Sequence, residues 1–391
     1  MYDFISQINR AGQGASKWDG MKRRNPSVPD GIIPFSIADM EFKTAPEIIA
    51  GLQAYLNDLA LVYTNPAEVY FGAVVRWMRE RHGWDIQSEW ISTSKGVVPA
   101  LSQAIHAFTE PEDGIIIMPP VYNPFFRAIK QNKRRIIANN LRIDHERYVI
   151  DFDDLAVKAK DPRNKVLLFC SPHNPVGRVW EKAELERIGA ICLENNVLII
   201  SDEIHFDLIM PGFTHTIFAA LSDELAENMI TCTAPSKTFN MAGIQTSNII
   251  IKNQKMREQY QQDVDRQLNI LGYKACEIAY TQCSGWLDAL LIVLDHNKRV
   301  AEDFIKRHIP QIKVFNLEGT YLQWWDCRGL GLNHHELEHF MTQDALLFLS
   351  EGYTFGEIGR GYERINLACP TVSLESGLER LEAALKSKKI I

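Results

Sequence analysis

Between about residues 90 and 285 the sequence alternates short apolar runs with longer amphipathic ones. This alternation constrains the fold more than any other feature of the chain. The apolar runs have the pattern of strands that are buried on both faces of a sheet. They cover residues 114–118, 165–169, 197–201, 228–231 and 247–251. The stretches between them, such as 181–196, have the pattern of helices. Strands that alternate with helices predict an α/β fold with a mostly parallel central sheet flanked by helices.

The two ends of the chain differ from this central region. The first 45 residues are rich in Gly, Pro and Asn and show little periodicity. We expect residues 1–45 to form an N-terminal arm that packs with a small domain, and residues 46–285 to form the large domain. From 286 to 391, helical runs flank two strand-like pieces. That pattern predicts a smaller α+β C-terminal domain.

Charge and cysteine usage argue against several classes of function. The net charge of −7 argues against a nucleic-acid partner or an anionic membrane surface. The seven cysteines include no Cys-x-x-Cys pair, so we interpret them as buried thiols of a reducing compartment. No His/Cys cluster has the spacing of a metal site. No signal-peptide pattern and no bilayer-length apolar run are seen, so we expect a cytoplasmic protein.

Lys237 lies in the run Ala-Pro-Ser-Lys-Thr-Phe-Asn, shortly after the predicted strand 228–231. Its small and hydroxyl-bearing neighbours suit a lysine that forms an imine with an aldehyde cofactor beside a bound phosphate. An amine is nucleophilic only when it is neutral, so such a lysine must be desolvated or lie near positive charge. The alternative for this run alone is an exposed lysine in a polar turn, and the rest of the chain decides between the two.

Unusual polar residues fall at the ends of the neighbouring predicted strands, where ligands bind in an open parallel sheet. Asp202 could hold a protonated pyridine nitrogen. Asn174, in a loop with two prolines, could donate to a ring oxygen, and His205 could lie near the same oxygen. Tyr122 could stack on a flat ring. Taken singly, each has a structural alternative as a helix cap, a turn former or a packed side chain.

Two further features could bind anions. A small-residue loop, residues 92–98, precedes the helical run 99–108, and Gly96, Val97 and Val98 there form a candidate phosphate cradle. Arg364, near a strand of the small domain, could clamp an α-carboxylate, although a surface ion pair is the alternative. The glycine motifs of dinucleotide-binding folds and of P-loops are both absent from the sequence.

Taken together, these motifs resemble those of fold-type I pyridoxal-phosphate enzymes, the aspartate aminotransferase superfamily. Within that superfamily the chain resembles the MalY/PatB group of cystathionine β-lyases. The resemblance covers nearly the whole length. The motifs that carry it are Lys17-Trp-Asp, Ile37-Ala-Asp-Met-Glu-Phe, Tyr63-Thr, Pro120-Val-Tyr, Pro172-His-Asn-Pro-Val-Gly, Ser201-Asp-Glu-Ile-His, Pro235-Ser-Lys-Thr-Phe-Asn, Gly319-Thr-Tyr-Leu and Arg364-Ile-Asn.

The resemblance implies a role for each matched residue. Lys237 would bind pyridoxal 5'-phosphate covalently and carry protons, with Tyr122 and Asp202 as further catalytic residues. The cofactor ring would meet Tyr122, Asn174, Asp202 and His205, and the phosphate would meet Gly96, Val97, Val98 and Ser236. Tyr63 would reach the phosphate of a neighbouring subunit, which implies a homodimer with shared active sites. The substrate would meet Arg364, Asp39, Trp18 and Tyr321.

Two positions depart from the pattern of the superfamily. Many members have a serine three residues before the lysine and an arginine eight residues after it. Here these positions are Ala234 and Gln245. The phosphate is then held with less positive charge, which weakens an aminotransferase interpretation relative to β-elimination on cystathionine, cysteine or related β-thio amino acids. Two alternatives stay open: an aminotransferase, and a cofactor-binding regulatory protein.

Overall fold

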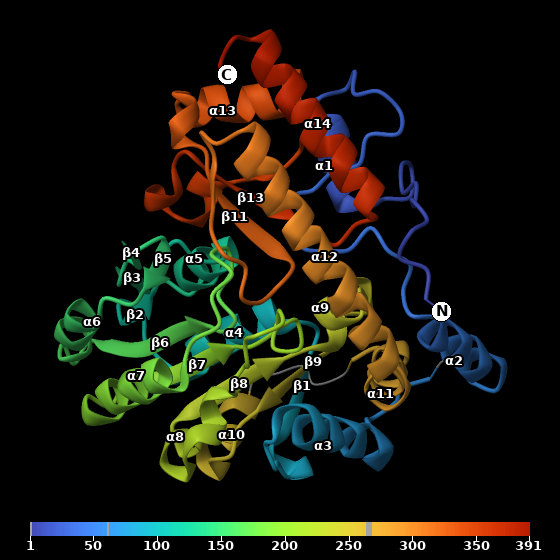
Figure 1. Ribbon diagram of the computed structural model, residues 1–391. Coiled ribbons are helices and arrows are strands. Elements are labelled where there is room, and N and C mark those ends of the chain that lie inside the picture. The colour runs from blue at the N-terminus through green and yellow to red at the C-terminus, as the bar shows by residue number, and fades with distance from the viewer. Residues whose placement is uncertain (1, 61, 263–267) are drawn as a thin grey trace.

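A seven-stranded mixed sheet forms the centre of the computed structural model, which describes residues 2–60, 62–262 and 268–391 (Figure 1). The strands lie in the order β1-β9-β8-β7-β6-β2-β3. Their bounds are β1 Ile91–Ser94, β2 Gly114–Ile117, β3 Arg135–Ala138, β6 Asn164–Cys170, β7 Leu198–Asp202, β8 Met229–Thr233 and β9 Ser247–Ile250. The block from β3 to β8 is parallel, whereas β9 runs antiparallel to both of its neighbours. The predicted α/β fold with a mostly parallel sheet is therefore confirmed.

The sequence predicted five of the seven strands, each with bounds within two residues of those observed, and missed β1 and β3. Residues 92–94 were expected in a loop, but they belong to β1, whose four residues are all buried. The polar pattern Ile-Ser-Thr-Ser conceals this strand. Asp202 is the last residue of β7 rather than the first residue after it. The following helix begins at Val97, two residues before the predicted run 99–108.

Helices cover both faces of the sheet, since the strands present apolar side chains alternately to each side. On β2, Ile115 and Ile117 belong to one core with α4 (Val97–Phe108), α5 (Asn123–Gln131) and α10 (Gln254–Gln261). Ile116 belongs to the other core. The helices of that second core near the sheet are α3 Glu68–His82, α6 Phe152–Ala159, α7 Lys182–Glu194, α8 Asp223–Glu227 and α11 Ile270–Gln282. The seven-stranded sheet is thus the middle of three layers.

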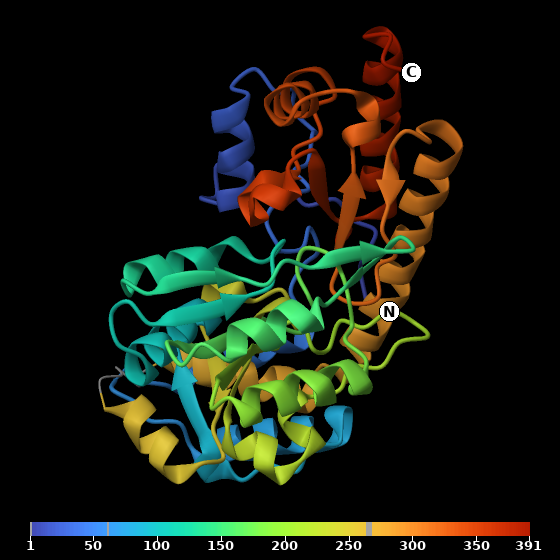
Figure 2. The same ribbon diagram turned by 90° about the vertical axis from the view of Figure 1, so that its left-hand side faces the viewer.

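A second, antiparallel sheet lies above the first in both views (Figures 1 and 2). Its order is β10-β11-β13-β12, with β10 Lys313–Val314, β11 Leu322–Asp326, β12 Ser350–Glu351 and β13 Tyr362–Asn366. Helices α12 Ser284–His308, α13 His334–His339 and α14 Thr371–Ser387 belong to this part, and β4 (Arg142–Asp144) and β5 (Arg147–Val149) form a separate hairpin. Helix α12 begins before the predicted boundary at 286, and the division into domains stays a prediction.

The N-terminal segment runs beside the second sheet although the two are far apart in sequence. Figures 1 and 2 both place α1 (Ser16–Arg24) in the upper part of the molecule, whereas α2 (Pro46–Asn57) lies lower. The backbone of Phe35 donates to Phe348 O at 2.8 Å and accepts from Asn366 N–H at 2.9 Å. These bonds bring the residues just before α2 next to β13, and so towards the ligand-binding edge of the large sheet.

All seven cysteines are free and buried, which agrees with the predicted thiols. No cluster of three or more His, Cys, Asp or Glu that could hold a metal ion occurs in the described ranges. Among the helices of the described residues, none is long and apolar enough to cross a membrane.

Candidate active site

A cavity lies where the carboxyl ends of β1, β6, β7 and β8 meet, as the topology of an open parallel sheet predicts. It encloses about 770 Å³, part of which is open to solvent. Among the described residues its lining consists of Ala38, Lys95, Gly96, Val97, Val98, Pro99, Tyr122, Cys170, Asn174, Asp202, Ile204, His205, Ser236, Lys237, Ala242, Gln245 and Thr246. Nine of the predicted site residues therefore come together, namely Gly96, Val97, Val98, Tyr122, Asn174, Asp202, His205, Ser236 and Lys237. Gln245, which departs from the pattern of the superfamily, lines the same cavity.

Lys237 lies in α9 (Pro235–Thr238), a single helical turn that begins directly after β8. The hydroxyl of the next residue, Thr238, donates to the buried Asp207 carboxylate at 2.7 Å and anchors this turn. Lys237 Nζ donates to Ala38 O at 2.5 Å. Burial lowers the pKa of the Lys237 amine to about 8, so about a tenth of it is neutral at pH 7 and about half at pH 8. A neutral amine of this kind can act as a nucleophile or a base.

Asp202 is buried at the end of β7 and lines the cavity close to Lys237. Its carboxylate accepts a hydrogen bond from Ile204 N–H at 3.2 Å. Within the described ranges it forms no ion pair with Lys, Arg or His. Burial raises the pKa of this carboxyl to about 7. A buried carboxylate without a cationic partner is costly, and a protonated ring nitrogen in the cavity would supply that partner.

Arg364, on β13 of the second sheet, lies beside the cavity and contacts Asn174 of its lining. Its Nη1 donates to Asn174 Oδ1 at 2.8 Å, and its Nη2 donates to Ser350 Oγ at 3.0 Å. The Nε group is buried and has no partner among the described residues. Burial lowers the pKa of the guanidinium to about 10. Asn174 and Arg364 thus form one polar group that joins the two sheets at the cavity, with donor capacity to spare.

The ring-facing candidates are His205 and Tyr122. His205 is buried, its Nδ1 has no partner in the described part of the chain, and burial holds the pKa of the imidazole well below its usual value. The imidazole is therefore neutral. It packs edge-on against the Tyr321 ring, with 5.9 Å between the two ring centroids. Tyr122 precedes α5, and burial raises the pKa of its phenol. Both side chains can contact a flat ring without adding charge.

The predicted phosphate cradle opens α4. Gly96 has a φ of 145°, a conformation that favours glycine, and the first helical N–H groups that follow it have no intrahelical acceptor. Thr246 lies across the same cavity, and its buried Oγ1 has no partner among the described residues. Thr246 was not predicted as a site residue, and its one signal in the sequence is its place next to Gln245. Free N–H groups and a spare hydroxyl form a site that fits a phosphate.

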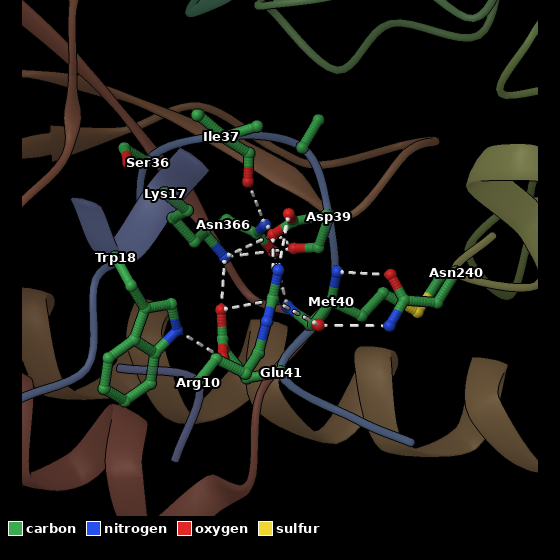
Figure 3. Close-up of polar contacts among 12 residues, drawn as sticks. Arg10, Lys17, Trp18, Ser36, Ile37, Asp39, Met40, Glu41, Asn240 and Asn366 are labelled. Carbon is green, nitrogen blue, oxygen red and sulfur yellow. Dashed lines mark hydrogen bonds and ion pairs between the residues drawn. The ribbon is translucent and has the colours of Figure 1, made fainter. Parts of the chain in front are cut away.

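Five predicted site residues lie outside the described lining of the cavity: Arg364, which contacts Asn174, and the four that follow. Trp18, Asp39 and Tyr321 do not appear in the described lining of the cavity. They adjoin it through the segment that carries Ala38. Trp18 Nε1 donates to Glu41 Oε2 at 3.0 Å (Figure 3). Tyr321 OH donates to Ala38 O at 2.9 Å. Tyr63 is 94% exposed. Their predicted roles towards substrate and partner subunit stay predictions.

Fold and cavity together define an α/β protein with a half-buried lysine of lowered pKa at the carboxyl edge of its sheet. Residues 31–381 match the model of the family described as aminotransferase class I and II, and the chain belongs to that family. The resemblance predicted from the motifs is therefore confirmed.

Comparison with individual proteins shows which members of the family the chain resembles. The chain is 39% identical to cystathionine beta-lyase PatB of Bacillus subtilis, over 98% of this chain and 100% of the relative. It is 30% identical to protein MalY of Escherichia coli, over 99% and 100%. Its structure matches cystalysin from Treponema denticola, which contains a pyridoxal 5'-phosphate cofactor, with a TM-score of 0.98 and 50% identity over 99% and 100% of the two chains.

Proposed function

We propose that the protein is a pyridoxal-phosphate-dependent carbon–sulfur lyase that acts on cystathionine, cysteine or related β-thio amino acids. The observation that carries the proposal is the presence, in one cavity, of the Lys237 amine and the Asp202 carboxylate, which has no cationic partner among the described residues. The names of the full-length relatives support the choice of lyase within the family. The products are pyruvate, ammonia and a thiol.

The residues of the cavity fit the cofactor. When bound, pyridoxal phosphate supplies an aldehyde carbon for an amine and a ring that accepts electrons from Cα. Lys237 is the residue that would hold it covalently, and Asp202 would keep the ring nitrogen protonated. The N–H groups after Gly96, with Ser236 and Thr246, would hold the phosphate. Because Gln245 stands in place of arginine, the phosphate would depend more on these neutral hydrogen-bond donors.

The chain's own residues then account for β-elimination. Arg364 and Asn174 hold the α-carboxylate of the amino acid, which fixes the Cα–H bond relative to the cavity floor. Lys237, neutral in part at pH 7 to 8, removes the Cα proton and becomes an ammonium. The Cβ–S bond breaks, and the sulfur takes up a proton to leave as a thiol. The unsaturated amino acid that remains hydrolyses to pyruvate and ammonia.

An aminotransferase would use the same residues up to the removal of the Cα proton. The two activities separate in one assay, because a lyase releases pyruvate without any keto-acid acceptor. We expect the purified holoenzyme to release pyruvate and thiol in equal amounts from cystathionine or an S-substituted cysteine, with no acceptor present. Turnover that depends on an added keto acid would assign it instead as an aminotransferase. No turnover with either would favour a cofactor-binding regulator.

Replacing Arg364 with lysine should weaken substrate binding more than it slows the chemistry. A lysine keeps the charge but loses the two-pronged contact with a carboxylate. We expect KM for cystathionine to rise by about 10- to 100-fold, on the scale of a lost charge-assisted hydrogen bond of about 1.5–3 kcal/mol. Steady-state kinetics with the matched surface variant Arg23→Lys as control measures this. An unchanged KM would remove Arg364 from the carboxylate site.

The active unit is proposed to be a homodimer in the cytoplasm. Tyr63 is almost fully exposed in the single chain, which suits a residue that acts on a partner subunit. Contact with a partner subunit would bury the apolar surface of this tyrosine ring, which is exposed to water in the single chain. Sedimentation of the holoenzyme should give twice the chain mass of 44.6 kDa, and a monomer would contradict the shared site.

A further inference from the structure

The segment 36–42 crosses the edge of the cavity and places a backbone carbonyl at the lysine. Ala38 O accepts two hydrogen bonds, from Lys237 Nζ at 2.5 Å and from Tyr321 OH at 2.9 Å. Tyr321 lies just before β11 of the second sheet, whereas Lys237 follows β8 of the first. The Ala38 carbonyl is therefore a meeting point of the two sheets and the N-terminal segment.

Two asparagines hold the backbone of this segment (Figure 3). Asn366 Nδ2 donates to Ile37 O at 2.8 Å and to Asp39 O at 2.7 Å. Asn240 accepts from Met40 N–H at 2.9 Å and donates to Met40 O at 3.1 Å and to Phe42 O at 2.9 Å. Asn240 comes three residues after Lys237, and Asn366 comes two residues after Arg364. The residues that hold the segment are thus tied directly to the residues of the site.

A charge cluster fixes the same segment from the side opposite to Asn240 (Figure 3). It consists of the cations Arg10 and Lys17 and the carboxylates of Asp39 and Glu41. Lys17, only 1% exposed, lies 3.1 Å from Glu41 Oε1 and 3.3 Å from Asp39 Oδ1. Arg10 lies 3.0 Å from Asp39 Oδ2 and 3.2 Å from Glu41 Oε1. Burying ions costs free energy unless they are paired. Four charged groups that pair with one another in this way are unusual in a terminal segment.

We propose that the segment 36–42 is a positioning element for Lys237. Its Ala38 carbonyl holds the amine, and the charge cluster of Arg10, Lys17, Asp39 and Glu41 sets the electrostatic field around it. This inference rests on the proposed function, in which Lys237 must lose and regain a proton. It gives the first 45 residues a direct part in the chemistry, beyond packing against the C-terminal sheet.

The charges that face Lys237 come from four elements. Asp39 and Asp202 favour the ammonium, whereas Arg364 and Lys17 favour the neutral amine. Burial is the largest influence and also favours the neutral amine. His205 and Tyr321, the other titratable neighbours, are neutral for the same reason. Asp39 and Lys17 belong to one cluster but act on Lys237 with opposite signs, which separates an electrostatic role from a structural one.

The test compares Asp39→Asn with Lys17→Met in the holoenzyme. Asp39→Asn removes a negative charge, so the ammonium is less favoured and the midpoints of the pH profile of kcat should move to lower pH. Lys17→Met removes a positive charge, so the midpoints should move to higher pH. At an effective dielectric constant of about 20, Coulomb's law gives roughly one pH unit for a unit charge about 10 Å away, so we expect shifts of that order.

A spectroscopic titration gives a second readout that needs no turnover. The visible absorbance of the cofactor bound at Lys237 should titrate with midpoints displaced in the same two directions. The exposed Arg23→Gln variant on α1 is the matched control and should titrate like the wild type. Thermal unfolding reports any loss of folding. If Lys17→Met does not fold, Arg10→Gln replaces it, since Arg10 is 21% exposed and its removal also leaves Asp39 less neutralised.

Opposite shifts support the positioning role. Midpoints that stay at the wild-type value, or that move in the same direction in both variants, overturn it. A wild type that binds the cofactor but releases no pyruvate defeats the proposed lyase function, and the absorbance titration still decides the positioning role. The two failures are therefore distinguishable.

Discussion

Lys237→Ala should abolish pyruvate release from cystathionine and from S-substituted cysteines. The variant loses both the nucleophile that holds the cofactor and the base that removes the Cα proton. General acid–base catalysis alone contributes about 10²–10⁴ in rate, so we expect kcat to fall by about 10⁴ or more. The substitution removes a charge that is costly to bury, and Ala38 O keeps the Tyr321 hydroxyl as a donor. Folding should therefore be preserved.

Three measurements make this prediction specific to Lys237. Borohydride reduction followed by peptide mapping should add the cofactor mass to the peptide with Lys237 in the wild type and not in the variant. Lys255→Ala, an exposed lysine on α10, is the matched control and should keep its activity. A small primary amine in the buffer should restore part of the proton transfer. Activity within tenfold of the wild type would show that another residue is the base.

The strands that frame the site could be predicted because burial on both faces leaves a simple trace in the sequence. The runs that became β2, β6, β7, β8 and β9 are apolar and short, and each was found close to its predicted place. The edge strand β1 was missed, because Ser92, Thr93 and Ser94 are polar although buried. A pattern of apolar residues cannot reveal a strand whose buried side chains carry hydroxyl groups.

The candidate site was predictable wherever a functional side chain follows a strand. Lys237, Asp202, Asn174 and Tyr122 follow or end different strands and meet in one cavity because parallel strands end at the same edge. Arg364 could be named from its motif, but its contact with Asn174 joins residues that are 190 positions apart. Such a contact follows from the packing of two sheets and has no local pattern.

Contacts made by backbone groups and long-range ion pairs could not be predicted from the sequence. The carbonyl of Ala38 is the acceptor for Lys237, and any residue at that position would offer a carbonyl. Trp18 and Asp39 were predicted to face the substrate from their motifs alone. That role stays a prediction. In the structure Trp18 donates to Glu41, and Asp39 pairs with Arg10 and Lys17. The direction of each side chain depends on such partners elsewhere in the chain, which a local motif does not contain.

The second large effect is expected for Asp202→Asn. An amide cannot balance a positive charge on the cofactor ring, so electrons from Cα would be accepted less readily. Loss of one preorganised electrostatic contact of this kind costs about 10²–10³ in kcat, and KM should change far less because Arg364 and Asn174 still bind the carboxylate. Asp202→Glu, which keeps the charge but moves it, is the matched control and should retain more activity than the amide variant.

The same substitution should stabilise the cofactor-free protein at alkaline pH. Burial raises the pKa of Asp202 from 3.8 to about 7, so ionisation is easier in the unfolded chain. The stability contributed by the protonated group is fully present below pH 4 and is lost as the pH rises towards 7. At pH 8 the ionised group costs a few kcal/mol, since one pKa unit corresponds to about 1.4 kcal/mol. Without cofactor at pH 8, the midpoint temperature of thermal unfolding should therefore be higher for Asp202→Asn than for the wild type. At saturating pyridoxal phosphate this difference should be reduced or reversed. A variant that is less stable than the wild type without cofactor, and that keeps its activity with it, would show that Asp202 is a structural residue.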